Sequence, residues 1–295
     1  RFSFLSFVFA LLLSAFLLGF AKEERGKQRG QSTIHSLSLS PLKMSVRATI
    51  RGSTYWIKYE NAKKANALTE KMYDQINSAL DEANEHKDTT FTVLTGEGNY
   101  YSSGNDFSPA EWDTKKAASK DVEIGFSRWV RRLIDHEKIL LGLVNGPAMG
   151  MSATTLGLFD YVVCSDKAFF YLPFPILGVG PEAGASVTLP AALGVSRANG
   201  LMLFGERLEA IDALKCGFVG KVFPHDEFEA RSIEMVNGFE KLPRHSLLAS
   251  KSLIRGPVWR EKMRGIAESE LDTLRKLFAS EETQKRIGAR FEKKK

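Results

Sequence analysis

Apolar residues recur along residues 46–291 in two alternating periods, which predict short strands separated by helices. The broken alternation of residues 46–59 indicates a hairpin that turns at Arg51-Gly52-Ser53. Compact apolar runs predict buried strands over residues 91–95, 139–144 and 161–165.

Helical spacing fills the segments between these runs. Apolar residues at positions 68, 72, 76 and 80 predict a helix over residues 68–86, with Thr69 as a candidate N-cap. A charged helix is expected around 119–137, and a helix of small residues over 148–158. Residues 227–291 are helical in pattern, with breaks at Pro243 and at Gly256-Pro257. This order predicts an α/β fold with parallel strand pairing.

The N-terminal 43 residues differ from the rest of the chain. Residues 2–21 are almost wholly apolar, and residues 22–43 form a polar, Ser- and Gly-rich linker. The apolar run is long enough to cross a bilayer as a helix. A signal peptide cleaved after Ala21 is a second interpretation, because Gly19 and Ala21 are small. Upstream sequence wrongly translated in a gene model is a third, since the first methionine is Met44. All three stay open, and the folded domain is predicted over 44–295.

Composition and charge exclude several classes of protein. The 295 residues are 43% apolar and 26% charged, as in ordinary globular domains and unlike disordered, collagen-like or coiled-coil chains. Two cysteines exclude a disulfide scaffold and a cysteine-based zinc module. The net charge of +6 would favour nucleic acid, but residues 1–43 carry +4 and residues 285–295 carry +5. Residues 44–284 therefore carry −3, so we expect this core to bind neither nucleic acid nor membrane.

The sequence lacks the motifs of several common sites. It contains no GxxxxGK[ST] phosphate loop, no GxGxxG dinucleotide fingerprint and no GxSxG nucleophile elbow. Its five histidines are scattered without metal-ligand spacing, so no metal site is expected. Cys164 falls in an apolar strand and Cys216 in a helical stretch, where packed thiols are expected.

Two Gly-rich turns that follow predicted strands are candidate ligand sites. Tyr101-Ser-Ser-Gly-Asn-Asp106 follows the strand at 91–95, and Gly146-Pro-Ala-Met-Gly-Met-Ser152 follows the strand at 139–144. Small residues in such turns let a ligand approach the backbone, and the first amides of a helix point outward. Two such turns could aim two N–H groups at one oxygen and form an oxyanion hole. Spacing alone does not separate this interpretation from ordinary turns.

Glu182 is the only acidic residue between Asp166 and Glu206, and it lies in the apolar stretch 169–190. Burial in such a stretch would raise the pKa of the carboxyl group and make it a candidate general base. Pro181-Glu182 also fits the first turn of a helix, where a carboxylate meets the positive end of the dipole. The two interpretations are compatible.

These three elements resemble, in order and spacing, the crotonase (enoyl-CoA hydratase/isomerase) superfamily over about residues 46–285. The forms Ser-Ser-Gly-Asn-Asp, Asn-Gly-Pro-Ala, Gly-Leu-Phe-Asp and Gly-Pro-Glu are most similar to the peroxisomal-type Δ3,Δ2-enoyl-CoA isomerase branch. The resemblance implies an α/β fold built as a ββα spiral over about residues 46–225. It also implies C-terminal helices over about 227–291 that assemble homotrimers.

The resemblance also implies roles for individual residues. The oxyanion hole would use the main-chain amides of Asn105 and Met151, and Glu182 would carry a proton from C2 to C4 of a 3-enoyl-CoA. The two glutamates of the family's hydratases fall at Thr154 and Phe174, so hydratase activity is not expected. Apolar side chains expected to shelter the base are those of Phe170, Phe174 and Leu177.

Other residues are expected along the path of the acyl-CoA substrate. By the resemblance they are Lys64, Ala65, Asn66, Ala67, Leu68, Ser102, Ser103, Gly104, Asp106, Phe107, Gly150, Phe174 and Pro181. Lys63 and Lys64 could meet the CoA phosphates, although solvated lysine pairs are common, and Lys251 is a weaker candidate. CoA is part of the substrate, so no separate cofactor is expected.

The resemblance favours a role in peroxisomal fatty-acid β-oxidation, with the mitochondrion as the alternative compartment. The chain ends Phe291-Glu-Lys-Lys-Lys295 and not in a Ser-Lys-Leu type of signal. Two other functions stay open: another crotonase activity such as thioester hydrolysis, and a non-catalytic module that binds acyl-CoA, a protein or RNA. The acid at position 182 argues for catalysis, because a module that only binds has little use for it.

Overall fold

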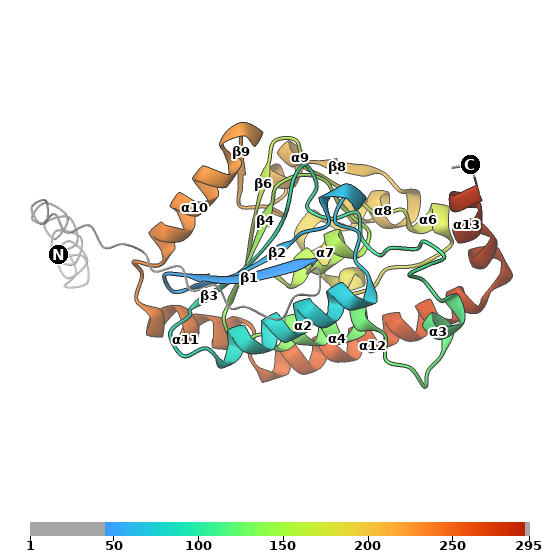
Figure 1. The fold of residues 1–295 in the computed structure, drawn as a ribbon, viewed down its shortest axis with the longest axis horizontal. Helices are drawn as coiled ribbons and strands as arrows, with labels where there is room; N and C mark the ends of the chain where they lie inside the picture. The colour runs from blue at the N-terminus through green and yellow to red at the C-terminus, as the bar shows by residue number, and fades with distance from the viewer. Residues whose placement is uncertain (1–44, 293–295) are drawn as a thin grey trace, which may run out of the picture. The chain divides into compact units, whose positions relative to one another are not determined.

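A computed structural model describes residues 45–292 (Figure 1). The apolar run and linker predicted within residues 1–43 lie outside the described residues, and so do residues 293–295. Within the described part, no helix combines the length and hydropathy needed to cross a bilayer.

A six-stranded sheet forms the centre of the described residues. Its order is β1 (Val46–Arg51), β2 (Thr54–Tyr59), β3 (Phe91–Gly96), β4 (Ile139–Val144), β6 (Tyr161–Ser165) and β9 (Lys221–Phe223). The predicted hairpin is confirmed, since β1 and β2 pair antiparallel, and every later pair in this sheet is parallel. A second sheet joins β5 (Ala148–Met149), β7 (Phe169–Tyr171) and β8 (Arg207–Glu209).

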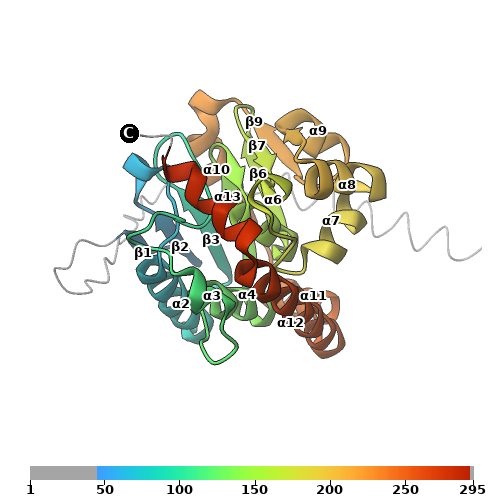
Figure 2. The same cartoon turned by 90° about the vertical axis from the view of Figure 1, so that its right-hand side faces the viewer.

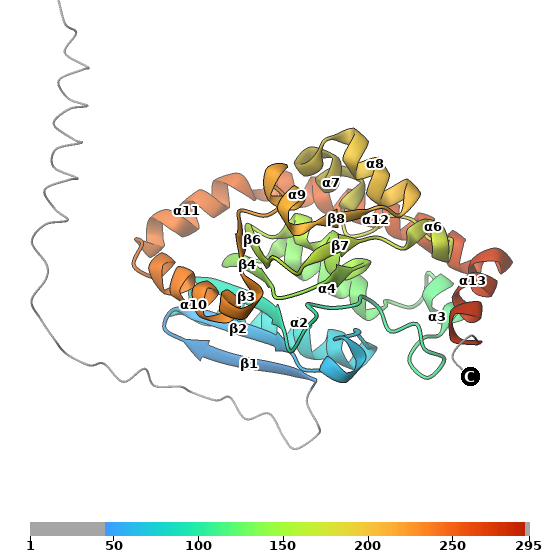
Figure 3. The same cartoon turned by 90° about the horizontal axis from the view of Figure 1, so that it is seen from above.

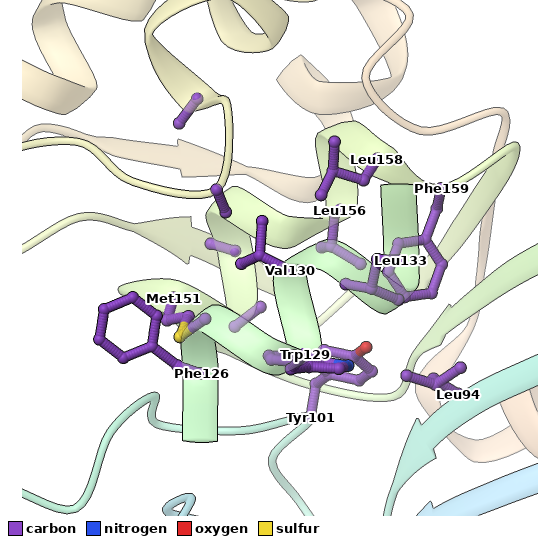
Figure 4. Close-up of a cluster of buried hydrophobic side chains, with 14 of the residues drawn as sticks. Leu94, Tyr101, Phe126, Trp129, Val130, Leu133, Met151, Leu156, Leu158 and Phe159 are labelled. Atoms are coloured by element: carbon purple, nitrogen blue, oxygen red, sulfur yellow. The ribbon is translucent and has the colours of Figure 1, made fainter. Parts of the chain in front are cut away.

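Alternating side chains of the large sheet enter two different cores. Tyr55, Ile57 and Tyr59 of β2 pack toward α2 (Glu70–Glu85) and α4 (Gly125–Asp135), whereas Trp56 packs on the opposite face, toward α10 (Phe228–Phe239). On the first face, Trp129, Val130 and Leu133 of α4 point into a buried cluster (Figure 4). This alternation is the period of two expected of a strand that is buried on both faces.

The helix predicted at 68–86 is confirmed, and its cap is Thr69, whose Oγ1 accepts a hydrogen bond from Met72 N at 3.2 Å. The prediction of one charged helix over 119–137 is wrong at its start. A short helix, α3 (Thr114–Ala118), ends before it, and α4 begins only at Gly125. Ser119 Oγ turns the chain by accepting from Asp121 N, and the carboxylate of Glu70 receives the N–H of Gly125.

The prediction of one helix over 148–158 is also wrong. Ala148 and Met149 pair with β7, and only then do α5 (Met151–Thr154) and the 3₁₀ turn η2 (Thr155–Leu158) follow. Gly150 joins the two segments with φ of 54°, a conformation that favours glycine. This break leaves the Met151 amide at the start of a turn with no preceding helical turn to cover it.

The C-terminal region is helical, as predicted, and breaks at both predicted prolines. It consists of α10, α11 (Arg244–Ile254), α12 (Pro257–Ala279) and α13 (Glu281–Glu292). Helix α12 runs along α4 and α3, and α13 lies against α6 (Phe174–Leu177) (Figures 2 and 3). Helices α7 (Ala185–Leu193) and α8 (Val195–Phe204) precede β8, and α9 (Ala210–Lys215) lies between β8 and β9, from which the chain enters this region. Segments far apart in sequence therefore meet at the edge where the strand-to-helix turns lie.

Candidate active site

A cavity of about 650 Å³ lies where the two Gly-rich turns meet α6, the loop before α7, and the last two helices. Thirteen of the residues expected at the site or as its shelter line it: Lys64, Ala65, Ala67, Ser103, Gly104, Asn105, Asp106, Phe107, Gly150, Met151, Phe174, Leu177 and Glu182. The base candidate and both oxyanion-hole candidates therefore face one cavity.

Gly104 allows the two Gly-rich turns to approach each other. Its φ is +84°, and a Cβ at this position would lie 2.6 Å from the carbonyl oxygen of Met149. Leu68 fixes the first turn on both sides of Asn105, by donating to Gly104 O at 2.8 Å and accepting from Asp106 N at 2.9 Å. A larger residue at 104 would push the turns apart.

The amides of Asn105 and Met151 are free to bind a ligand. In residues 45–292 neither N–H donates to another protein group, although the neighbouring amide of Gly150 donates to Tyr171 O at 2.8 Å. Free, fixed N–H groups that face one cavity are what an oxyanion hole requires.

Tyr73 of α2 links the two turns from behind. Its hydroxyl donates to Asn105 Oδ1 and lies 3.2 Å from Met151 Sδ. Burial first, and then the charge of Glu182, raise the pKa of the Tyr73 hydroxyl well above its usual value, so the phenol keeps its proton. The sequence did not reveal this role, because a tyrosine on the apolar side of a helix is normally a packing residue.

The Glu182 side chain is 7% exposed, and its two carboxylate oxygens have different surroundings. Oε1 accepts a hydrogen bond from Thr154 Oγ1 at 2.8 Å, and Oε2 is buried with no partner in the described residues. Burial raises the pKa of Glu182 to about 8; the Thr154 hydrogen bond opposes that rise and Glu270 adds to it. A carboxyl group with this pKa and a free oxygen can both accept and return a proton near neutral pH.

The Thr154 hydroxyl can serve both protonation states of this base. Its Oγ1 lies 2.8 Å from Glu182 Oε1 and 3.1 Å from the carbonyl oxygen of Met151. When Glu182 is ionised, Thr154 donates to it. When Glu182 carries a proton, Thr154 can turn its own proton to Met151 O and accept from the acid, so neither state leaves a buried group unpaired.

The interpretation of Glu182 as a first-turn helix acid is wrong. Helix α7 starts at Ala185, and the preceding Ala183 and Gly184 have φ of 60° and 75°, which end the helix before it reaches Glu182. The start of α7 is instead held by Glu270 of α12, whose carboxylate accepts from Gly184 N at 2.6 Å and Ser186 N at 2.9 Å. No local pattern in the sequence links two positions 86 residues apart.

Four residues expected on the substrate path do not line the cavity: Asn66, Leu68, Ser102 and Pro181. Asn66 and Ser102 are buried and hold the loops, since Asn66 Nδ2 donates to Tyr100 O at 2.8 Å and Ser102 Oγ donates to Asn66 O at 2.8 Å. Phe170, expected as shelter, also lies outside the lining and packs edge-on against Phe218.

Of the three lysines considered as partners of the CoA phosphates, Lys251 does not line the cavity. Lys251 is buried, and its Nζ donates to Asp160 Oδ2 at 2.6 Å and Lys138 O at 2.7 Å, so it cannot meet a CoA phosphate. Lys63, Lys64 and Arg290 line the cavity, and Lys64 Nζ lies 3.0 Å from Asp106. In the described residues no group of three or more His, Cys, Asp or Glu side chains could hold a metal ion.

Several lining residues come from parts of the chain that the motifs do not reach. They are Tyr100, Phe126, Leu274, Phe278 and Arg290. Leu274, Phe278 and Arg290 lie on α12 and α13, whose amphipathic pattern indicates a packed helix but does not say which cavity it closes.

Comparison with known proteins gives consistent matches. A family model described as enoyl-CoA hydratase/isomerase matches residues 49–295. Enoyl-CoA delta isomerase 2 of Rattus norvegicus is 42% identical over 240 residues, which cover 80% of this chain and 61% of the relative. The peroxisomal enoyl-CoA delta isomerase 3 of Mus musculus is 37% identical over 203 residues, which cover 68% and 63%. The enoyl-CoA hydratase/isomerase structure from Pseudoalteromonas atlantica T6c superposes with a TM-score of 0.77 at 29% identity, over 85% and 98%.

The chain spans about three fifths of the length of these two curated relatives. The solved structure, in contrast, is covered almost completely, so its fold can be compared over its whole length. The mixed α/β spiral with helices at its C-terminal end confirms the fold predicted from the motifs. On the family model, the curated relatives and the fold together, the chain belongs to the enoyl-CoA hydratase/isomerase family.

Proposed function

We propose that this protein is a Δ3,Δ2-enoyl-CoA isomerase, which converts a 3-enoyl-CoA to the trans-2-enoyl-CoA in fatty-acid β-oxidation. One observation carries the proposal: the buried carboxylate of Glu182, which has an oxygen without a partner in the described residues, lines the same cavity as the unpaired amides of Asn105 and Met151. The names of the two curated relatives, both enoyl-CoA delta isomerases, support the same reaction.

The proposed reaction uses one base for two proton transfers. Ionised Glu182 removes a proton from C2, and the electron pair of that C–H bond moves toward the thioester oxygen to give a dienolate. The amides of Asn105 and Met151 donate hydrogen bonds to that oxygen and stabilise its charge. Glu182 then returns the proton to C4, the double bond forms between C2 and C3, and the thioester carbonyl is restored.

The lining of the cavity argues against hydration. The acidic residues that line it are Asp106 and Glu182, and Asp106 is engaged by Lys64 Nζ at 3.0 Å and by Ser108 N at 2.9 Å. Thr154 and Phe174 stand where the hydratases have glutamates. Adding water to a double bond needs a positioned base for the water, and no second carboxylate shares the surroundings of Glu182 within this lining.

The cationic side chains of Lys63, Lys64 and Arg290 suit the phosphates of CoA, and we assign that end of the cavity to them. Ala65 and Ala67 would border the pantetheine, and Phe107, Phe174 and Leu177 would pack around the acyl chain. CoA enters as part of the substrate, so the reaction needs no resident cofactor.

We also propose a homotrimer and a peroxisomal location, with the mitochondrion as the alternative. Large apolar side chains are exposed on α8, α11 and α12, with Phe204 75%, Leu253 85% and Val258 83% exposed, and self-association would bury them. The mouse relative is named as a peroxisomal protein, which supports the peroxisome. Light scattering of the purified chain tests the trimer, and cell fractionation tests the compartment.

The test of the proposed function is turnover of a 3-enoyl-CoA by the purified chain, followed by the absorbance of the conjugated 2-enoyl thioester. The wild-type chain should form product, and Glu182→Gln, which keeps the side-chain size and removes the base, should lose turnover while still binding acyl-CoA. Release of free CoA without isomerisation would identify thioester hydrolysis instead. Binding without any turnover would identify a non-catalytic module.

A further inference from the structure

Glu270 is a buried carboxylate that the proposed reaction does not use. It lies on α12 and is 8% exposed. Its two oxygens accept hydrogen bonds from the main-chain amides of Gly184, at 2.6 Å, and Ser186, at 2.9 Å. Its charge forms no ion pair with a cation of residues 45–292. A buried carboxylate without a cation is expensive unless N–H groups satisfy it, and the first amides of α7 do so here.

The segment that Glu270 holds is the one that carries Glu182. Ala183 follows the base directly and has φ of 60°, a left-handed conformation that costs energy in a residue with a side chain. Gly184 has φ of 75°, and a Cβ there would lie 2.3 Å from Met263 Cε, again on α12. A strained turn of this kind persists only where its surroundings fix it, and in this fold α12 supplies that support.

We propose that Glu270 is a positioning residue for the isomerisation: by tying Gly184 and Ser186 to α12, it fixes the direction in which the Glu182 carboxylate faces the oxyanion hole. The proposal rests on the proposed function. It gives the C-terminal helices a second task in addition to closing the cavity with Leu274 and Phe278.

Glu270 also acts on Glu182 through its charge. A nearby negative charge disfavours ionisation, so Glu270 adds to the rise in the pKa of Glu182 that burial mainly causes. Other charged or titratable groups face the base: Tyr73 from α2, Arg131 from α4, and Arg264 and Glu268 from α12 across an adjoining cavity of about 300 Å³. The two arginines are engaged in ion pairs, Arg131 with Glu123 and Glu268, and Arg264 with Asp135.

The variant Glu270→Gln in the full chain distinguishes a role in orienting Glu182 from a role in folding stability alone. Glutamine keeps the size, loses the charge and turns an NH₂ group toward one of the two amides. We expect kcat on a 3-enoyl-CoA to fall about 10-fold or more, because a small displacement of a base is costly, with KM changed by less than about 2-fold. The midpoint of the rise in kcat/KM with pH should move to lower pH, because a like charge has gone. Glu261→Gln, an exposed acid on the same helix, is the matched control and should change none of these.

Two further measurements complete the test. Amide hydrogen exchange in residues 183–187 should quicken in Glu270→Gln and stay unchanged in Glu261→Gln. Glu270→Asp keeps the charge with a shorter reach, so its pH midpoint should stay near that of the wild type while kcat falls less. It also serves if the glutamine variant fails to fold.

The proposal is overturned if Glu270→Gln keeps the wild-type kcat and pH midpoint. It is also overturned if activity falls only in proportion to the folded fraction, with the midpoint and the local exchange unmoved. An inactive wild-type chain would instead refute the proposed function, and the exchange comparison would then test the tether to α12 by itself.

Discussion

The hydrogen bond from Thr154 to Glu182 provides a sharp test of how the base is tuned. Thr154 is fully buried, and its Oγ1 lies 2.8 Å from Glu182 Oε1. Thr154→Val replaces the hydroxyl by a methyl group of similar size, so it removes the hydrogen bond to Glu182 and the longer contact with Met151 O at 3.1 Å. Because that hydrogen bond favours the ionised form of Glu182, its loss should raise the pKa of the base.

The size of the effect follows from the difference between a hydrogen bond to a charged group, about 1.5–3 kcal/mol, and the neutral hydrogen bond that Thr154 can make with the protonated acid, about 0.5–1.5 kcal/mol. This difference is about 1–1.5 kcal/mol and one pKa unit corresponds to about 1.4 kcal/mol, so the pKa of Glu182 should rise from about 8 by roughly one unit. In the proposed reaction the base acts in its ionised form, and the ionised fraction at pH 7 falls about tenfold per unit rise in the pKa. At pH 7, kcat/KM should therefore fall about 10-fold, and the difference should shrink as the pH rises above the new pKa.

The assay is the pH dependence of kcat/KM with a 3-enoyl-CoA for the wild type and the variant. Thr155→Val is a matched control: Thr155 is also fully buried, and its Oγ1 donates to Met151 O at 2.8 Å without touching Glu182. The reasoning is refuted if Thr154→Val lowers activity equally at every pH, or if Thr155→Val shifts the midpoint to the same extent.

Three other variants have expected outcomes. Tyr73→Phe removes the hydroxyl beside Asn105 and Met151, so kcat should fall about 10-fold with an unmoved pH midpoint, measured by steady-state kinetics; a shifted midpoint would contradict a role confined to the oxyanion hole. Gly104→Ala forces a Cβ to 2.6 Å from Met149 O at φ of +84°, so activity should fall at least 100-fold while acyl-CoA binding weakens less, by calorimetry. Glu182 has a folded pKa raised to about 8 from 4.5, so its favourable contribution to folding is complete below pH 4.5 and is lost as the pH rises to 8. Above pH 8, the free energy of unfolding of Glu182→Gln should therefore exceed that of the wild type by a few kcal/mol, measured by denaturant titration. Equal stability of the two proteins at pH 9 would contradict a desolvated carboxylate at position 182.

The sequence predicted the parts of the fold that local patterns encode. The strands at 139–144 and 161–165 are short apolar runs bounded by turns, and Thr69 caps its helix as its side chain allows. The predictions of single helices over 119–137 and 148–158 were wrong where tertiary contacts overrode the local pattern. Glu70, on α2, accepts a hydrogen bond from the N–H of Gly125 and so fixes where α4 begins. Pairing with β7 keeps Ala148 and Met149 extended.

The candidate site divides in the same way. Glu182, Asn105 and Met151 could be named because motifs that resemble a known family bring them together, and the structure has all three facing one cavity. Tyr73 and Glu270 could not be named, because each contacts the site's loops across a long separation in sequence. Their residue types, a tyrosine on an apolar helix face and an acid on a long charged helix, are ordinary for packing and for solvent exposure.

The most direct test of the central claim follows the proton. A 3-enoyl-CoA labelled with deuterium at C2 is converted in ordinary water, and the 2-enoyl product is analysed by mass spectrometry and NMR for label at C4. Because Glu182 is 7% exposed and carries the only base function proposed, part of the deuterium should arrive at C4 of the product. Product formed at the full rate with no deuterium at C4 under any condition, or label transfer that persists in Glu182→Gln, would contradict a single sheltered glutamate as the acid and base.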